Sequence, residues 1–481
     1  MSSSGCSPAA HSHSQTAPLP SSLPEELLLY IFDLATYGPA REINALVELR
    51  PFEKDYSDDV DALCDEPLKA KRALALTCKL FRRLVLKFLF EDIRIRYGSE
   101  HLAEAMKREQ EVGTFVKRVS VSLQGFKASG HWVASYPTGT RRILQRCPNV
   151  LILTRPQNLR VEAADQEDDS FSTPIFPEAD ISLDDLRLPN LRRVDWFNSP
   201  IDTLPSTLPT PKFIWKSNSL QTLTIGPDHF PLQLNVSPIV DMPKLHTIRL
   251  RSMHTPGNVE EGVIDPESVR LPALRKLVFS LPDGIYTLFF EQFLRACGPR
   301  IEEIEIAPDA RFLRHDFISV LLLNCSNATV LNFPVFTTKP TRKNTRRQAV
   351  EIIYLITQVG LSSVGFRNDF EDEDDADSQW AHLAGHLLAL FGARSRFSKL
   401  ERLALYGKEW EWVLSDPRSK GAMKLIKSKN VEIVCEHESV TTTLKSLCET
   451  GSISEASLYA ISASEFMRPW ETLIECTYVN R

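Results

Sequence analysis

The chain has 481 residues, of which 43% are hydrophobic and 25% are charged, and its formal net charge is −6. These values are typical of folded globular proteins and exclude a largely disordered chain. The mild negative charge argues against general nucleic-acid binding, which needs clustered Lys and Arg. No stretch reaches the roughly 18 apolar residues of a membrane helix, and residues 1–22 lack the features of a secretory signal. We therefore expect an intracellular protein of the cytoplasm and/or nucleus, with residues 1–22 as a disordered tail and with no nucleic-acid or membrane partner.

The first predicted element is a helix over residues 23–35. Pro24 suits the start of a helix, because the N–H group that proline lacks would have no partner there. Glu25 and Glu26 place negative charge at the positive end of the helix dipole. Four apolar residues recur at helical spacing, and two more lie beside them: Leu23, Leu27, Ile31 and Leu34, then Leu28 and Phe32. A helix of about three turns is not stable alone in water, so we expect it to pack on a neighbour.

The predicted neighbour follows after an interruption. Residues 37–68 contain several prolines and an acidic run at 58–61, which predicts an insertion with a helix near 41–49. Residues 68–90 return to helical spacing, with Lys and Arg on the outer side. Residues 91–96 then alternate apolar and charged residues, which predicts a strand. A compact helical domain over residues 23–95 is therefore expected to run directly into the structure that follows.

Two motifs in this region resemble the F-box. The first is Leu23-Pro24-x-Glu26-Leu27-Leu28-x-x-Ile31-Phe32, and the second is Thr77-Cys78-Lys79-Leu80-Phe81-Arg82-Arg83-Leu84. Residues 88–95 are similar to the exit of fungal F-box-like families, in which leucine-rich repeats follow. Phe81 stands where the family usually has Trp, and the insertion lengthens the link between the helices.

The resemblance implies a function for these helices. In the family they bind the Skp-type adaptor of a cullin-RING (SCF) ubiquitin ligase, and the repeats hold the target protein. Carried over by motif position, the adaptor-binding residues are Leu23, Pro24, Leu27, Leu28, Ile31, Phe32, Leu80 and Phe81. The alternative is that the helices only cap the end of a repeat array, because terminal repeats need a capping surface.

Residues 96–436 are organised by a recurring phrase, in which an apolar anchor is followed by two more apolar residues at alternating positions. Clear copies are Leu220–Ile225, Leu245–Leu250, Leu274–Phe279 and Ile301–Ile306, and weaker copies begin at residues 191, 328, 361 and 400. First anchors at 220, 245, 274, 301 and 328 lie 25, 29, 27 and 27 residues apart. This is the period of a leucine-rich repeat, in which a strand and a returning helix make one coil. One coil cannot bury its apolar face alone, so the copies must stack.

The predicted fold class is therefore α/β, a leucine-rich-repeat solenoid (horseshoe) preceded by a small all-α F-box domain. The solenoid covers residues 96–436, and residues 437–481 form a helical cap. Returning helices are predicted at 285–296, 313–323 and 348–358, irregular stretches at 155–187 and 198–214, and a last strand at 431–434.

The sequence carries no recognisable catalytic centre, so we predict a protein that is not an enzyme and needs no cofactor or metal. Hydrolase, Walker and dinucleotide-binding motifs are absent. The 9 cysteines are dispersed without a C-x-x-C pair, as expected of reduced structural thiols. His382 and His386 have ligand spacing but lack the Glu of a metalloprotease motif, which favours two ordinary helix residues. The acidic run 371–375 is expected to be a solvated loop, and the basic run 342–347 is a candidate nuclear-import signal.

The favoured function is that of the substrate-recognition subunit of an SCF-type ubiquitin ligase, which holds an unknown target near ubiquitin delivered by other subunits. The alternative is a leucine-rich-repeat interaction scaffold without ligase association. In a repeat strand the residues between the anchors project from the concave face. Charged residues gather there on adjacent coils, and they are the predicted target-binding residues: Arg249, Arg251, Lys276, Glu303 and Glu305. The competing explanation is that these charges only keep an exposed sheet soluble.

Overall fold

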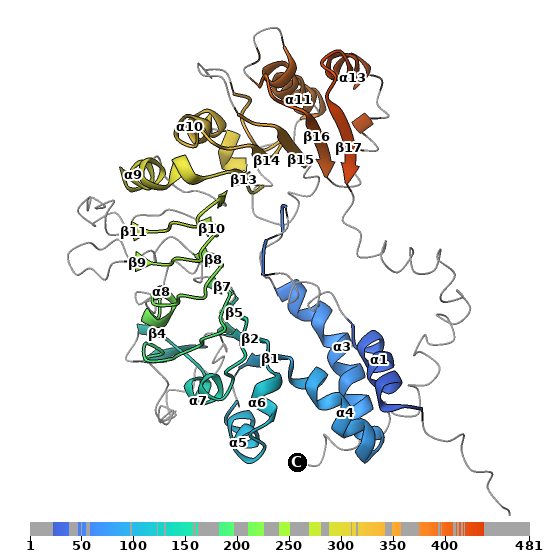
Figure 1. The fold of residues 1–481 in the computed structure, drawn as a ribbon, viewed down its shortest axis with the longest axis vertical. Coiled ribbons are helices and arrows are strands. Elements are labelled where there is room, and N and C mark those ends of the chain that lie inside the picture. Colours follow the sequence, from blue (N-terminus) through green and yellow to red (C-terminus); the bar gives the residue numbers. More distant parts are fainter. Residues whose placement is uncertain are drawn as a thin grey trace, which may run out of the picture.

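The computed structural model describes most of the chain between residues 23 and 436. The described residues are 23–37, 47–49, 51–53, 58–96, 99–122, 124–128, 131–156, 160–161, 182–196, 210–225, 240–250, 269–279, 288–308, 310–313, 316–341, 349–356, 375–392, 395, 397–406, 410, 413–414, 417 and 419–436. They form an α/β fold built on one 12-stranded sheet, which extends along the longest axis of the molecule (Figure 1).

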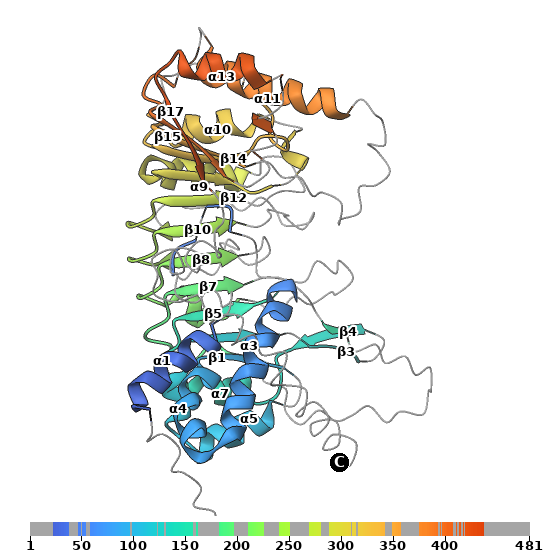
Figure 2. The same cartoon turned by 90° about the vertical axis from the view of Figure 1, so that its right-hand side faces the viewer.

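The strands of this sheet follow one another in chain order, and every neighbouring pair is parallel. They are β1 (Asp92–Ile95), β2 (Arg118–Val121), β5 (Ile152–Arg155), β7 (Arg193–Trp196), β8 (Thr222–Ile225), β10 (Thr247–Leu250), β12 (Lys276–Phe279), β13 (Glu303–Ile306), β14 (Val330–Pro334), β15 (Ile352–Ile356), β16 (Arg402–Tyr406) and β17 (Glu432–Glu436). Figure 2 shows them stacked along the molecule. In β12, Leu277 is in register with Ile248 and Ile304 and belongs to the apolar core, so Lys276 and Val278 point to the opposite face.

Shorter elements connect these strands. The helices are α5 (Glu100–Arg108), α6 (Val112–Phe115), α7 (Thr140–Gln145), α8 (Lys212–Trp215), α9 (Leu288–Cys297), α10 (Phe317–Asn324), α11 (Asp375–Phe391) and α13 (Ser419–Lys427), with the 3-10 turns η3 (Gly298–Arg300) and η4 (Ala310–Leu313). Two small sheets contain β3 (Gln124–Ala128), β4 (His131–Ser135) and β6 (Arg160–Val161), and β9 (Val240–Asp241) with β11 (Val269–Arg270). Figure 1 places α7, α9 and α10 on one side of the large sheet, where one continuous apolar core lies.

Three helices form the N-terminal part: α1 (Glu25–Ala35), α3 (Asp58–Thr77) and α4 (Lys79–Phe90). Figure 1 shows them on the other side of the sheet from α9 and α10. The Sγ atom of Cys78 accepts a hydrogen bond from the Phe81 N–H (3.4 Å) and caps the start of α4, which separates α4 from α3. Residues of α1 and α4 share a small apolar cluster of their own: Leu28, Phe32, Leu84, Val85 and Phe88.

The predicted fold class is wrong. The structure shows an α/β fold with a 12-stranded parallel sheet, in place of a leucine-rich-repeat horseshoe preceded by a small all-α F-box domain. The anchors mark strands, but their spacing is irregular: β5 and β7 begin 41 residues apart at Ile152 and Arg193, and β15 and β16 begin 50 residues apart at Ile352 and Arg402. Between β7 and β12 the described connecting residues contain the four-residue α8 and the short strands β9 and β11, rather than one returning helix for each coil.

The N-terminal helices are continuous with the sheet. Only Glu91 separates α4 from β1, which is the first strand of the large sheet. Residues 47–49 and 51–53, which lie between α1 and α3 in the chain, contact side chains of several central strands. The insertion predicted at 37–68 is also partly helical, because α3 begins at Asp58 and includes Pro67.

Most local predictions that fall on described residues are confirmed. The structure has the helices predicted at 23–35, 285–296 and 313–323 and the strand predicted at 431–434. The helix predicted at 348–358 is wrong, because these residues contain β15, in which buried Ile353 and Leu355 alternate with less buried neighbours. Outside the described residues lie 1–22, 38–46, 342–347, 361–366, 371–374, Arg251, 437–481 and most of the stretches 155–187 and 198–214. Within the described ranges, no helix combines the length and the apolar content needed to cross a membrane.

Candidate functional site

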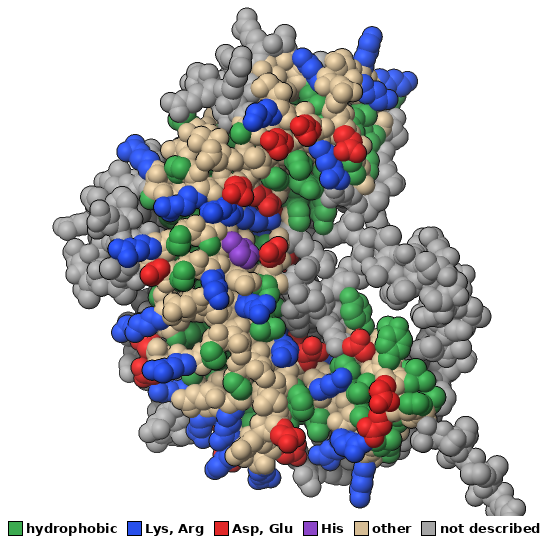
Figure 3. Space-filling model, in the orientation of Figure 1, with side chains coloured by type: hydrophobic (Ala, Val, Ile, Leu, Met, Phe, Trp, Pro, Cys, Tyr) green, Lys and Arg blue, Asp and Glu red, His purple; other side chains and the backbone are tan. Residues whose placement is uncertain are grey.

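The N-terminal helix α1 presents apolar side chains to solvent. The exposed large apolar residues between positions 23 and 37 are Leu23 (51%), Leu27 (43%), Tyr30 (58%), Ile31 (42%), Leu34 (43%) and Tyr37 (46%), here called the α1 apolar face. Figure 3 shows apolar side chains gathered over the N-terminal helices. Single exposed apolar residues are common on proteins, whereas a contiguous group of them marks an interaction surface.

The opposite side of α1 holds the helix to α4. Leu28 and Phe32 are buried there, and the rings of Phe32 and Phe81 make an edge-to-face contact with centroids 4.9 Å apart. Leu80 and Phe81 are half-buried and pack against the same cluster. The predicted adaptor-binding residues thus fall into two sets, with Leu23, Pro24, Leu27 and Ile31 exposed and with Leu28, Phe32, Leu80 and Phe81 turned inward.

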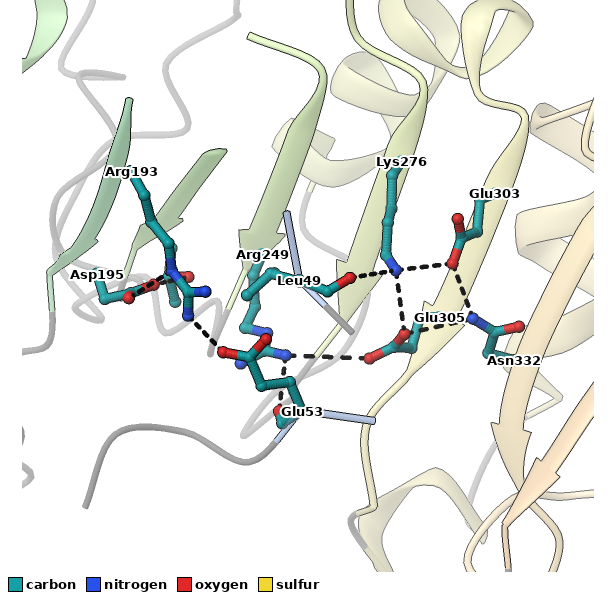
Figure 4. A network of polar contacts seen from close by, with 10 residues as sticks. Leu49, Glu53, Arg193, Asp195, Arg249, Lys276, Glu303, Glu305 and Asn332 are labelled. Atoms are coloured by element: carbon teal, nitrogen blue, oxygen red, sulfur yellow. Dashed lines mark hydrogen bonds and ion pairs between the residues drawn. The ribbon is translucent and has the colours of Figure 1, made fainter. Parts of the chain in front are cut away.

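A second candidate site lies on the face of the large sheet that is opposite to its apolar core. Its polar side chains come from β7, β8, β10, β12, β13 and β14, and they form what we call the polar sheet face: Arg193, Asp195, Thr222, Thr224, Arg249, Lys276, Glu303, Glu305 and Asn332. Residues 47–49 and 51–53, here called the covering segment, lie on it. Figure 4 shows the polar contacts that join the segment to the strands.

Arg193 lies at the centre of the first group of contacts. Its Nη2 atom donates to Glu53 Oε1 in the covering segment (2.6 Å), and its Nε atom donates to Asp195 Oδ2 (2.8 Å). Asp195 also accepts from Thr224 Oγ1 (2.6 Å). The Arg193 and Asp195 side chains are each only 4% exposed. Charges removed from water to this degree are stable only when they are paired and hydrogen-bonded, as they are here.

Lys276 lies at the centre of the second group. Its Nζ atom is 2.7 Å from Glu303 Oε1 and 3.6 Å from Glu305 Oε2. Asn332 Nδ2 donates to the same two carboxylates, at 2.9 Å and 3.3 Å. Arg249 Nη2 approaches Glu305 Oε1 to 4.0 Å, so side chains of β10, β12, β13 and β14 form one connected network.

The polar sheet face binds the covering segment largely through the segment's main chain. Three side chains of the face donate to its carbonyl groups: Thr222 Oγ1 to Val47 (2.8 Å), Lys276 Nζ to Leu49 (3.2 Å) and Arg249 Nη2 to Glu53 (2.7 Å). The described residues of the segment form no strand or helix. The side chains of the face therefore satisfy carbonyl groups that secondary structure would satisfy elsewhere.

Apolar contacts hold the same segment. Leu49 is 4% exposed and Phe52 is 6% exposed, and the Phe52 ring centroid lies 5.8 Å from that of Tyr406 on β16. Phe52 has a φ of 56°, a left-handed conformation that is unfavourable for a bulky residue. Glu53 reaches Arg193 on β7 while its neighbour Phe52 reaches Tyr406 on β16, so two adjacent residues of the segment contact strands that are distant in the order of the sheet.

Burial and charge act in opposite directions within the network. Burial disfavours the charge on Arg193, but Asp195 and then Glu53 outweigh it and raise the pKa of the guanidinium above its ordinary value. At Glu305 burial dominates and raises the pKa of the carboxyl, although Lys276 and Arg249 act against it. Glu305 therefore takes up a proton at a higher pH than an exposed glutamate does.

The structure brings together four of the five predicted target-binding residues, but it does not leave them open. Arg249, Lys276 and Glu305 lie beneath the covering segment, and Glu303 is partly exposed at its edge. The fifth, Arg251, is outside the described residues. Sequence reasoning missed Leu49, Phe52 and Glu53 altogether, because no local pattern in a proline-containing stretch indicates a contact with strands more than a hundred residues away.

One histidine and three cysteines of the described chain are buried in the protein interior. His386 on α11 is buried beside the Thr338 carbonyl (Nε2 to O 2.9 Å), and burial lowers its pKa to about 4. Burial raises the pKa of Cys147 and Cys325 to about 12 and that of Cys297 to about 11, so these thiols stay protonated at neutral pH. Among the residues that the structure describes, no group of three or more His, Cys, Asp or Glu side chains could hold a metal ion.

No family model matches the chain, and a search of curated proteins finds no significant match. The function is therefore inferred from the residues of this chain and their geometry.

Proposed function

We propose that this protein is the substrate-recognition subunit of an SCF-type ubiquitin ligase, and that the α1 apolar face binds its Skp-type adaptor. The observation that carries the proposal is the exposure of this face, while the other side of the same helix is already packed on α4. Fully burying a Leu or Ile side chain contributes about 1.5–3 kcal/mol. A partner with a complementary apolar groove would therefore gain substantial binding energy from α1, as grooves that bind amphipathic helices do.

The resemblance of residues 23–32 and 77–84 to the F-box motif supports the same assignment. In the proposal, the outward set contacts the adaptor directly: Leu23, Pro24, Leu27 and Ile31. The inward set, Leu28 and Phe32 with Leu80 and Phe81, fixes the angle at which α1 is presented. Leu27 and Ile31 of the outward set share α1 with Leu28 and Phe32 of the inward set, so the first motif encodes both the proposed contact and part of its support.

The proposed mechanism is proximity. One end of the molecule is held by the adaptor and, through it, by a cullin-RING ligase, and another surface of the chain holds a target protein. Ubiquitin is transferred by other subunits, and this chain raises the effective concentration of the target's lysines near them. In this role the protein supplies binding energy and orientation rather than a catalytic group.

The experiment that tests the proposal is capture of a purified Skp-type adaptor by the full chain. The double variant Leu27→Asp, Ile31→Asp places two charges on the α1 apolar face and should weaken capture at least about 100-fold, because two buried contact residues contribute about 2 kcal/mol each. Both side chains are exposed in the free chain, so circular dichroism should show an unchanged fold.

The matched control is Leu323→Asp on α10, where the leucine is 52% exposed but lies on the other side of the sheet. This variant should capture the adaptor as the unmodified chain does. If the α1 double variant also captures the adaptor normally, the proposal is wrong, and an interaction scaffold without ligase association becomes the better assignment.

A further inference from the structure

We infer that the polar sheet face is a binding site for a short peptide that offers main-chain carbonyl groups and one carboxylate, and that the covering segment occupies it as the chain's own ligand. The inference deepens the proposed function and rests on it in one respect, because it assigns the peptide to the target protein. The contacts themselves come from the described residues of this chain alone. Main-chain contacts hold a peptide, side-chain contacts select its sequence, and the way the segment is bound allows it to be replaced.

Any peptide is held through its main chain. The donors Thr222, Arg249 and Lys276 project from β8, β10 and β12 and reach carbonyl oxygens, not side chains, of the covering segment. A carbonyl group is common to every residue type, so these contacts hold a main chain without specifying its sequence. Side-chain pockets then give specificity, which is the usual division of work in peptide recognition.

Selection comes from three side chains of the occupant. Leu49 and Phe52 are buried against the sheet, and the Glu53 carboxylate is bound by Arg193. Asp195 holds Arg193 from the other side, so the guanidinium is already oriented toward the position that Glu53 fills. Arg is well suited to carboxylate recognition because its planar donors match the geometry of that group. The preferred ligand therefore has an apolar residue followed, three positions later, by an aromatic residue and then an acidic one.

The rest of the network keeps the cations in place. Glu303 and Glu305 on β13 hold Lys276, and Asn332 on β14 donates to both carboxylates. The face is thus a preorganised set of donors whose own charges are largely balanced within the sheet. A ligand has to supply only carbonyl groups and one carboxylate, which lowers the cost of ordering the site on binding.

The contacts of the covering segment allow a peptide of the target protein to replace it. The covering segment adds no strand to the sheet, so no ladder of main-chain hydrogen bonds has to break for it to leave. Phe52 adopts a left-handed conformation in this position, and this conformation is unfavourable for a bulky residue. A peptide of the target protein that carries the same groups without that strain competes for the site, against the high local concentration of the linked segment.

The test uses a fluorescent peptide with the sequence of residues 46–54 and the full chain in which Leu49, Phe52 and Glu53 are replaced by Gly. Without these side chains, the covering segment no longer fills the positions on the sheet face that select a ligand. The peptide should bind this chain at least about 10-fold more tightly than the unmodified chain, measured by fluorescence anisotropy. A peptide with Glu53→Gln should bind at least about 10-fold more weakly, because the hydrogen bond from Arg193 then goes to a neutral amide oxygen instead of a carboxylate.

A milder variant guards against loss of the fold. The full chain with only Glu53→Gln keeps both apolar contacts of the segment, and it should still bind the peptide more tightly than the unmodified chain does. A scrambled peptide is the control for charge alone. The inference is overturned if the 46–54 peptide binds the opened chains no better than the scrambled peptide.

Adaptor capture by the same variants separates this inference from the proposed function. Both opened chains keep the α1 apolar face and should capture the Skp-type adaptor normally. Loss of peptide binding with intact capture removes the peptide site but leaves the ligase role. Peptide binding by a chain that captures no adaptor keeps the site and removes its assignment to a ligase target.

Discussion

The α1 apolar face and the polar sheet face depart from the usual distribution of residues in opposite ways. On α1, leucine, isoleucine and tyrosine side chains are exposed to solvent, whereas on the sheet arginine, aspartate and glutamate side chains are buried. Folded proteins normally bury apolar residues and expose charged ones, so both regions call for an explanation. The explanation differs because of where the partner lies.

At the polar sheet face the partner is already present. The covering segment and the neighbouring strands supply hydrogen bonds to the buried charges, which would otherwise destabilise the fold. At α1 the described part of the chain leaves the apolar side chains exposed, and the proposed partner is another molecule. In these assignments an internal ligand leaves satisfied buried charge, whereas an external ligand leaves exposed apolar surface.

The largest effect on stability is expected from the removal of a buried charge at the polar sheet face. Arg193→Ala leaves Asp195 and Glu53 without their cation in a site that excludes water. We expect a loss of about 3–5 kcal/mol in the free energy of unfolding, because the cost is that of an uncompensated buried charge. The shift of the urea midpoint measures it.

Arg275→Ala is the control for that experiment, since Arg275 and Glu302 form an ion pair of similar length (3.1 Å) whose side chains are 45% and 60% exposed. Exposed pairs contribute under about 1 kcal/mol, so its midpoint should move little. Equal shifts for the two variants would show that the polar sheet face is not buried as described.

His386 is a buried histidine whose neutral form is favoured in the folded chain. His386 has a pKa of about 4 in the folded chain against an ordinary value of 6.5. Between these values the unfolded chain binds more protons than the folded one, so stability falls as the pH is lowered from 6.5 towards 4. The difference corresponds to about 3 kcal/mol in the free energy of unfolding.

Urea unfolding at pH 7 and pH 4.5 measures this effect. His386→Asn should remove most of the pH dependence while it keeps a donor near the Thr338 carbonyl. The exposed His101, replaced by Asn, is the control for the loss of a histidine. An unchanged pH dependence in the His386 variant would mean that other groups dominate acid unfolding.

The smallest effect on stability is expected at the α1 apolar face. Tyr30→Ser removes a side chain that is 58% exposed, and the free energy of unfolding should change by no more than about 0.5 kcal/mol. Phe32→Ala, two residues on and 2% exposed, should instead cost about 3–5 kcal/mol. A large loss for Tyr30→Ser would mean that this face is covered within the chain and is not free for an adaptor.

The sequence predicts most strands of the sheet because a strand is a local pattern. The phrase Leu274-x-x-Leu277-x-Phe279 alternates with period two, and its buried members lie on the core side of β12. The same reasoning failed at β15, where a nearly continuous apolar run, Ile352–Ile356, does not distinguish a buried strand from a helix. The prediction of the architecture is also wrong. It assumes a regular repeat from a few similar spacings, but the intervals from β5 to β7 and from β15 to β16 are much longer.

The candidate site was predicted only in part. The alternation along the strands correctly placed Arg249, Lys276 and Glu305 on the face opposite to the core. Their burial was not predictable, because it depends on residues 47–49 and 51–53. The sequence predicts a helix near 41–49, but the described residues 47–49 are not helical, and the segment contacts strands from β7 to β16 only in the folded chain. For α1, the motif identified the helix, but only the packing of Leu28 and Phe32 shows which side remains exposed.

The covering segment has one more property, which comes from its place in the chain between α1 and α3. The same short stretch of main chain is tied covalently to the helices proposed to meet the adaptor and held by hydrogen bonds on the face proposed to meet the target. If emptying the sheet face changes the adaptor's dissociation constant, the two proposed binding equilibria are thermodynamically linked through this stretch. Whatever factor an occupied sheet face imposes on the adaptor's dissociation constant, an engaged adaptor imposes on the target's, because such a coupling free energy is reciprocal.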